Sequence, residues 1–120
     1  MTCVWEGISD KLHLHMKPSK LLSYIKHNNV ITSDVLCNGV VLSELQLHEN
    51  FNRIKNLDKK KIGHGYDCSA CDPLLCLICK LYKVTIVHDF CGNIIKYTIT
   101  GNDKHHNKTI KFYSNSGHFW

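Results

Sequence analysis

A cysteine near one end of the chain and a histidine near the other are the residues best suited to covalent chemistry. Cys3 opens an amphipathic stretch that includes Trp5, and His118 stands beside Phe119 after a β-branched segment. A thiol is a strong nucleophile as the thiolate, which a helix N-terminus and a neighbouring imidazole both favour. The imidazole then acts as a general base and later as a general acid. Because nearly the whole chain separates Cys3 from His118, only the fold can bring them together.

Four further cysteines form two Cys-x2-Cys pairs, at Cys68, Cys71, Cys76 and Cys79. Paired cysteines of this spacing can hold a tetrahedral zinc ion. However, only four residues separate the two pairs, far fewer than in a zinc ribbon, and Asp72-Pro73 predicts a helix start inside that gap. Cys76 and Cys79 then fall among leucines, where cysteine behaves as a small hydrophobic residue. We therefore favour buried thiols with no metal and no cofactor, and keep a zinc site on these four cysteines as the alternative.

The composition indicates a single domain spanning residues 1–120, because 43% of its 120 residues are hydrophobic and can form a core. Seven cysteines without a secretory signal favour reduced thiols or a metal site over a disulfide framework. The net charge of +5 is mild, and much of it falls between Arg53 and Lys61. That run is typical of a solvated loop, so we do not expect nucleic acid as a partner.

The sequence predicts neither a membrane span nor a secretory signal. The most apolar run, Leu74 to Val87, is broken by Lys80 and Lys83, so no segment is predicted to cross a bilayer. Met1 leads directly into an amphipathic segment instead of a signal peptide. We expect a cytoplasmic protein with no membrane partner.

The elements that must position Cys3 and His118 follow from hydrophobic periodicity. Helices are predicted over residues 3–12, 18–28, 42–56 and 74–82, the last nearly all apolar and therefore buried. Strands are predicted over residues 84–88, 94–100 and 109–113. Residues 30–39 are interpreted as a connection or short element, with a turn signal at Asn38-Gly39. Helices first and a small antiparallel sheet last make an α+β arrangement.

This order of elements, together with the sequences at both ends, resembles the OTU (ovarian-tumour-domain) cysteine proteases, especially the small viral ones. The family pattern Asp-Gly-Asn-Cys-Leu-Phe/Trp-x-x-Ile-Ser is matched from the cysteine onward by Cys3-Val-Trp-Glu-Gly-Ile-Ser9. Between the ends, Leu21 to Ile25 resembles a family helix, and Gly65 to Val87 resembles its glycine-containing approach to a buried helix and strand. The family ends with a strand, a turn and His-Tyr/Phe, as Ile110 to Phe119 does.

The resemblance implies a papain-type fold in which N-terminal helices pack on a small, mainly antiparallel C-terminal sheet. It implies Cys3 as the nucleophile and His118 as the base. Trp5, Gly117 and Trp120 are the candidate substrate-binding residues; the alternative for the two tryptophans is a packing role, although Trp120 beside His118 could line a substrate cleft.

Two departures from the family pattern affect the predicted site. Met1-Thr2 replaces the family's Asp-Gly-Asn, and Trp120 stands where many members carry an Asp or Asn that orients the histidine. The sequence assigns no third member of a catalytic triad, and Asn115 is the candidate. A Cys–His dyad is therefore the simplest catalytic arrangement that the resemblance implies.

The implied substrates are a viral polyprotein, ubiquitin or a ubiquitin-like modifier on host proteins, or both, in the cytoplasm of a host cell. Two other classes stay open. One is a zinc-stabilised module that binds protein or nucleic acid, built on the four paired cysteines. The other is a protease fold without activity that serves as an interaction domain.

Overall fold

The computed structural model describes residues 3–58, 60, 69, 71–100, 108–115 and 118–119, and for Cys3, Asn115, His118 and Phe119 it describes the backbone alone. In chain order these residues form α1 (Cys3–Lys11), α2 (Pro18–His27), β1 (Val35–Cys37), β2 (Val40–Val41), α3 (Glu44–Lys55), α4 (Pro73–Tyr82), β3 (Thr85–Phe90), β4 (Asn93–Ile99), β5 (Thr109–Asn115) and β6 (His118–Phe119). None of these helices combines the length and the apolar character that a bilayer crossing demands.

The strands form one mixed sheet in the order β2-β1-β4-β3-β5-β6. Its pairs are antiparallel except for β3 and β5, which run parallel. The predicted α+β class is therefore confirmed. The expected position of the whole sheet after the helices is wrong, because β1 and β2 precede α3. The prediction missed the parallel pair and the β1–β2 hairpin, whose two turn residues, Asn38 and Gly39, have φ angles of 52° and 79°. Two consecutive positive φ angles suit a tight hairpin turn.

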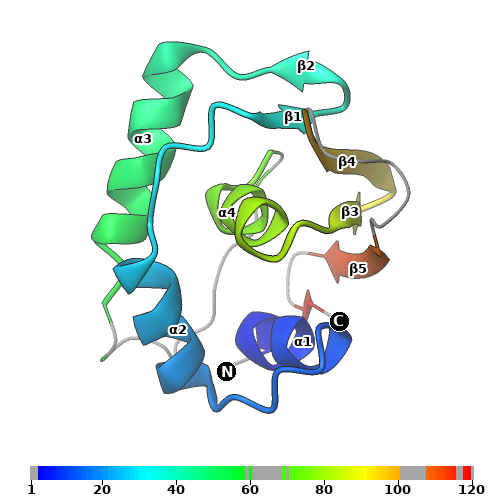
Figure 1. Cartoon of the computed structure of the whole chain (residues 1–120). Coiled ribbons are helices and arrows are strands. Elements are labelled where there is room, and N and C mark those ends of the chain that lie inside the picture. The colour runs from blue at the N-terminus through cyan, green and yellow to red at the C-terminus, as the bar shows by residue number, and fades with distance from the viewer. Residues whose placement is uncertain are drawn as a thin grey trace.

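Helix α4 is the centre of the molecule, with α3 on one side and strands β1, β3 and β4 on the other (Figure 1). Its start follows from the sequence: the Asp72 carboxylate accepts a hydrogen bond from the Leu74 amide at 2.9 Å, and Pro73 takes the first helical position. Every residue from Pro73 to Cys79 is buried. A helix that is apolar on all sides is stable in water only when it is enclosed, as α4 is in this fold.

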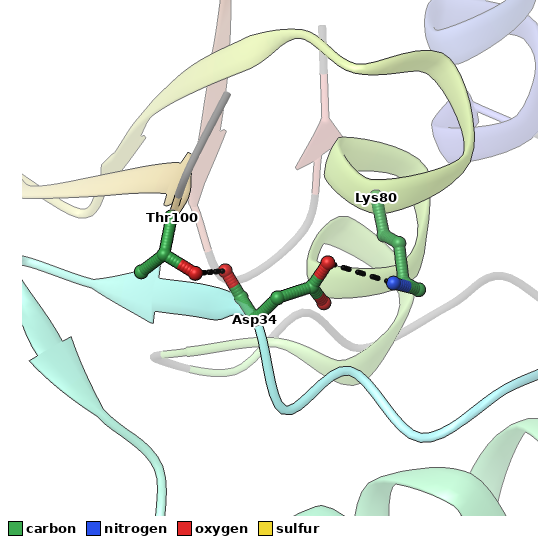
Figure 2. A network of polar contacts seen from close by, with 3 residues as sticks. All are labelled: Asp34, Lys80 and Thr100. Atoms are coloured by element: carbon green, nitrogen blue, oxygen red, sulfur yellow. Dashed lines mark hydrogen bonds and ion pairs between the residues drawn. The ribbon is translucent and has the colours of Figure 1, made fainter. Parts of the chain in front are cut away.

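A polar network ties the C-terminal half of α4 to the start of β1 (Figure 2). Lys80 Nζ lies 2.7 Å from the Asp34 carboxylate, and both side chains are about one-third exposed. The backbone carbonyl of Asp34 accepts hydrogen bonds from the Thr100 amide at 2.8 Å and the Thr100 hydroxyl at 3.1 Å. The network joins α4, β1 and the end of β4 at the surface of the core.

Cys37 and Cys71 form a disulfide with a Cα–Cα distance of 5.8 Å. The expectation of reduced thiols is therefore wrong for this pair. Tyr97 explains their proximity: it pairs with Cys37 in the β1–β4 ladder, and its hydroxyl accepts a 2.8 Å hydrogen bond from the Asp72 amide. Since Asp72 follows Cys71 directly, Tyr97 brings the two sulfurs to the same place although 34 positions separate them in sequence.

Candidate active site

Helix α1 begins at Cys3, as the sequence predicted. Val4, Trp5 and Ile8 lie on its buried side, with at most 3% of each residue exposed. Ser9 fixes the far end of the helix, because its hydroxyl accepts a hydrogen bond from the Met16 amide at 3.1 Å and donates one to the Met16 carbonyl at 3.2 Å. The first residue of a well-anchored helix is a position where the helix dipole favours a negative charge.

Strand β6 begins at His118 and extends the sheet by pairing with the end of β5. In this ladder Asn115 lies opposite His118, and Ser114 lies opposite Phe119. Helix α1 contacts β6 (Figure 1). The fold therefore brings the helix that starts with Cys3 against the strand that starts with His118, although they come from opposite ends of the chain. The side chains of both residues lie outside the described part, so the contact between thiol and imidazole stays a prediction.

The other predicted site residues are placed as follows. Trp5 is 3% exposed and belongs to the hydrophobic core, which favours a packing role over direct contact with a substrate. Asn115, the candidate third residue, is the backbone neighbour of His118 across the ladder. Gly117 and Trp120 lie outside the described residues.

Cys76 and Cys79 are buried free thiols, as the sequence favoured. Burial raises the pKa of the Cys76 thiol to about 12, with a further contribution from the Asp72 carboxylate and from Cys79. Burial likewise raises the pKa of Cys79 to about 12, with Asp34 contributing. Both thiols are therefore protonated at neutral pH and are poor nucleophiles.

The alternative prediction, a zinc ion held by all four paired cysteines, is wrong. Cys71 is bonded to Cys37, so it cannot supply a thiolate, while Cys68 lies outside the described residues. In the described ranges there is no group of three or more His, Cys, Asp or Glu side chains that could hold a metal ion.

His88 is a functional candidate that the sequence did not reveal. It lies on β3 with no exposed surface, and its Nε2 atom is 2.7 Å from the Ser114 hydroxyl on β5. The Phe90 ring lies nearby, with 5.6 Å between ring centroids. Burial lowers the pKa of His88, and this outweighs the opposite effect of Asp72 and Asp89. A histidine at an inward position of an otherwise β-branched strand was the signal that could have found it.

An open depression of about 490 Å³ lies on α3, lined by Glu49, Asn52, Arg53 and Asn56. Among the described residues, its lining contains neither a thiol nor an imidazole.

Comparison with protein-family models, with curated proteins and with solved structures finds no significant match to this chain.

Proposed function

We propose that this chain is an OTU-like, papain-type cysteine protease in which Cys3 is the nucleophile and His118 is the general base. The observation that carries the proposal is the contact between α1 and β6, the two elements that begin with these residues. The family resemblance at both ends of the sequence requires that juxtaposition.

Four of the other thiols in the described residues are unsuitable as nucleophiles. Cys37 and Cys71 are bonded to each other, and Cys76 and Cys79 are buried with raised pKa values. Cys91 is an exposed thiol in the turn between β3 and β4, which makes it a suitable control. A helix N-terminus is one of the settings in which the thiolate form of a cysteine is favoured.

In the proposed mechanism, the Cys3 thiol transfers its proton to His118 as the sulfur attacks the scissile carbonyl carbon. Backbone N–H groups around Cys3 stabilise the oxyanion of the tetrahedral intermediate. The C–N bond then breaks, and the amine leaves with the proton from His118. Water attacks the resulting thioester with His118 again as base, which releases the carboxylate and regenerates the thiol.

The proposed substrates are peptide or isopeptide bonds, either in a viral polyprotein or at the C-terminus of ubiquitin or a ubiquitin-like protein. They follow from the family resemblance, and a dyad without a third residue is sufficient for this mechanism.

The test is covalent capture of the chain by ubiquitin that carries a C-terminal electrophile. We expect an adduct with the unaltered chain and with Cys91→Ser, and none with Cys3→Ala. Because Cys91 is exposed, its replacement removes an accessible thiol without opening the core. An adduct that survives Cys3→Ala would show that Cys3 is not the nucleophile. If ubiquitin gives no adduct, a library of peptides is screened for cleavage, and the absence of both activities would leave the inactive interaction domain.

A further inference from the structure

The end of β5 is held by a buried hydrogen bond between two polar side chains. His88 has no exposed surface and Ser114 is 6% exposed, and their Nε2 and Oγ atoms are 2.7 Å apart. The neighbouring side chains Ile86 and Phe112 are fully buried and apolar. A polar pair in such surroundings is stable only when the two groups satisfy each other. The bond therefore fixes the separation of His88 and Ser114 more narrowly than an apolar contact would.

The register of β3 and β5 shows which motion the His88–Ser114 hydrogen bond opposes. In the parallel β3–β5 ladder His88 lies opposite Phe112, and Phe90 lies opposite Ser114. The His88–Ser114 bond thus runs diagonally, two residues further along β5 than the ladder partner, and opposes sliding of β5 along β3. A backbone bond acts at the same point, because the Cys91 amide donates to the Ser114 carbonyl at 2.9 Å. Ser114 is consequently fixed through both its side chain and its backbone.

Ser114 is also where β6 attaches. It lies opposite Phe119 in the β5–β6 ladder, and the next residue, Asn115, lies opposite His118. Strand β6 has two residues, so it contributes little to its own placement and takes its position from β5 and α1. A displacement at Ser114 is therefore passed to the backbone of His118.

We propose that His88 and Ser114 are positioning residues for His118, holding its backbone in register with the helix that begins at Cys3. This inference rests on the proposed function, since it assigns a purpose to the position of His118. Burial of His88 is consistent with the role, because a neutral imidazole keeps a fixed hydrogen-bonding pattern over the pH range in which a protease works.

The experiment measures the alkylation rate of Cys3 by iodoacetamide against pH, resolved from the other thiols by peptide mass spectrometry. In the unaltered chain Cys3 should react at lower pH than an ordinary cysteine, and His118→Ala defines the profile without the imidazole. In Ser114→Ala, the dependence of the Cys3 alkylation rate on pH should resemble that of His118→Ala. At pH 6 the alkylation rate of Cys3 should fall about tenfold to hundredfold. Ser114→Thr keeps the hydroxyl, so its alkylation profile for Cys3 should match that of the unaltered chain.

The matched control is Ile110→Val, at the opposite end of β5, which weakens the same strand but keeps the His88–Ser114 bond. It should leave the Cys3 profile unchanged. Hydrogen exchange gives a second measurement: the amides of His118 and Phe119 should exchange faster in Ser114→Ala than in Ile110→Val, while α4 stays equally protected in both.

The outcomes separate the two ideas. If Cys3 in the unaltered chain is alkylated with the pH dependence of an ordinary cysteine, the proposed function is overturned, and with it the role assigned to His118. If Cys3 reacts at low pH in the unaltered chain and equally fast in Ser114→Ala, the positioning role alone is overturned. Equal exchange of the β6 amides in Ser114→Ala and Ile110→Val would show that the bond does not hold β6.

Discussion

The centre of the molecule and its joined ends differ in how many interactions hold them. At the centre, α4 is enclosed by α3 and three strands, its start is capped by Asp72, and a disulfide fastens the segment before it to β1. At the ends, a nine-residue helix meets a two-residue strand. Helix α4 is fixed by packing on several elements at once, whereas β6 takes its position from β5 and α1, and α1 itself is anchored on α2.

In the proposed protease, stability and chemistry are therefore located in separate parts of the fold. A rigid centre allows the site to be assembled from short elements whose positions depend on a small number of contacts. Such elements are also the first to open in local unfolding. We therefore expect substitutions at the centre to change the free energy of unfolding, and substitutions at the ends to change the reactivity of Cys3.

The largest expected effect comes from the same substitution made in both regions. Ile78 in α4 and Ile8 in α1 both have no exposed surface. Ile78→Ala should lower the free energy of unfolding by about 4 kcal/mol and Ile8→Ala by nearer to about 2 kcal/mol, because we expect the surroundings of α1 to close on the cavity more completely than those of α4. Urea unfolding followed by circular dichroism measures both. Equal losses would contradict the distinction between the regions.

Reduction of the Cys37–Cys71 disulfide is the next largest effect. Opening this cross-link frees a long loop in the unfolded chain, which should cost about 2–4 kcal/mol of stability. The midpoint of thermal unfolding should fall on adding dithiothreitol. In the double variant Cys37→Ala, Cys71→Ala the reductant should have no further effect. A reductant response that persists in the double variant would point to another cross-link.

The pH dependence of stability tests the polar pair that connects the two regions. Burial lowers the pKa of His88 below its ordinary value of 6.5. Below pH 6.5 the unfolded chain therefore binds a proton that the folded chain does not, so stability is complete above this pH and falls as the pH drops. The slope due to His88 should be at most about 1.4 kcal/mol per pH unit.

Urea unfolding at pH values from 7.5 to 5 measures this slope, and His88→Phe should make it shallower. The variant also loses the bond to Ser114, which lowers stability at every pH and does not affect the comparison of slopes. An identical slope in His88→Phe would assign the acid response to other groups.

The smallest expected effect is at the network of Figure 2. Lys80 and Asp34 are about one-third exposed, so solvent screens their attraction. Lys80→Met should lower stability by about 0.5 kcal/mol, and 1 M salt should remove most of the difference. Lys55→Met, on the exposed side of α3, controls for the loss of a positive charge. A loss as large as that of Ile78→Ala would mean that this surface network belongs to the rigid centre.

The parts of the fold that the sequence predicted have local causes. Asp72-Pro73 specifies the start of α4 by itself, and the apolar run after it requires burial. The strands β3, β4 and β5 were visible in their β-branched composition. Helix α1 and its start at Cys3 followed from the spacing of Val4 and Ile8, one turn apart.

The parts that were missed depend on contacts between distant residues. The β1–β2 hairpin has strands of three and two residues, too short to show an alternating pattern, although its turn was visible at Asn38-Gly39. The Cys37–Cys71 bond depends on Tyr97, which lies far from both in sequence. The partner of His88 is set by the parallel pairing of β3 with β5, which no local pattern specifies. For the same reason the α1–β6 contact could be expected from a resemblance but not from periodicity.

The contact between α1 and β6 also sets an order of events during synthesis. It joins the first and last described elements of the chain, so its loop is nearly as long as the chain itself. Contacts of such large sequence separation form late, after local helices and hairpins. A chain still emerging from the ribosome has α1 but not β6, so Cys3 would meet its proposed base only when the domain is finished. In the proposed protease, the topology thus delays activation of the Cys3 thiol until the rest of the domain has folded.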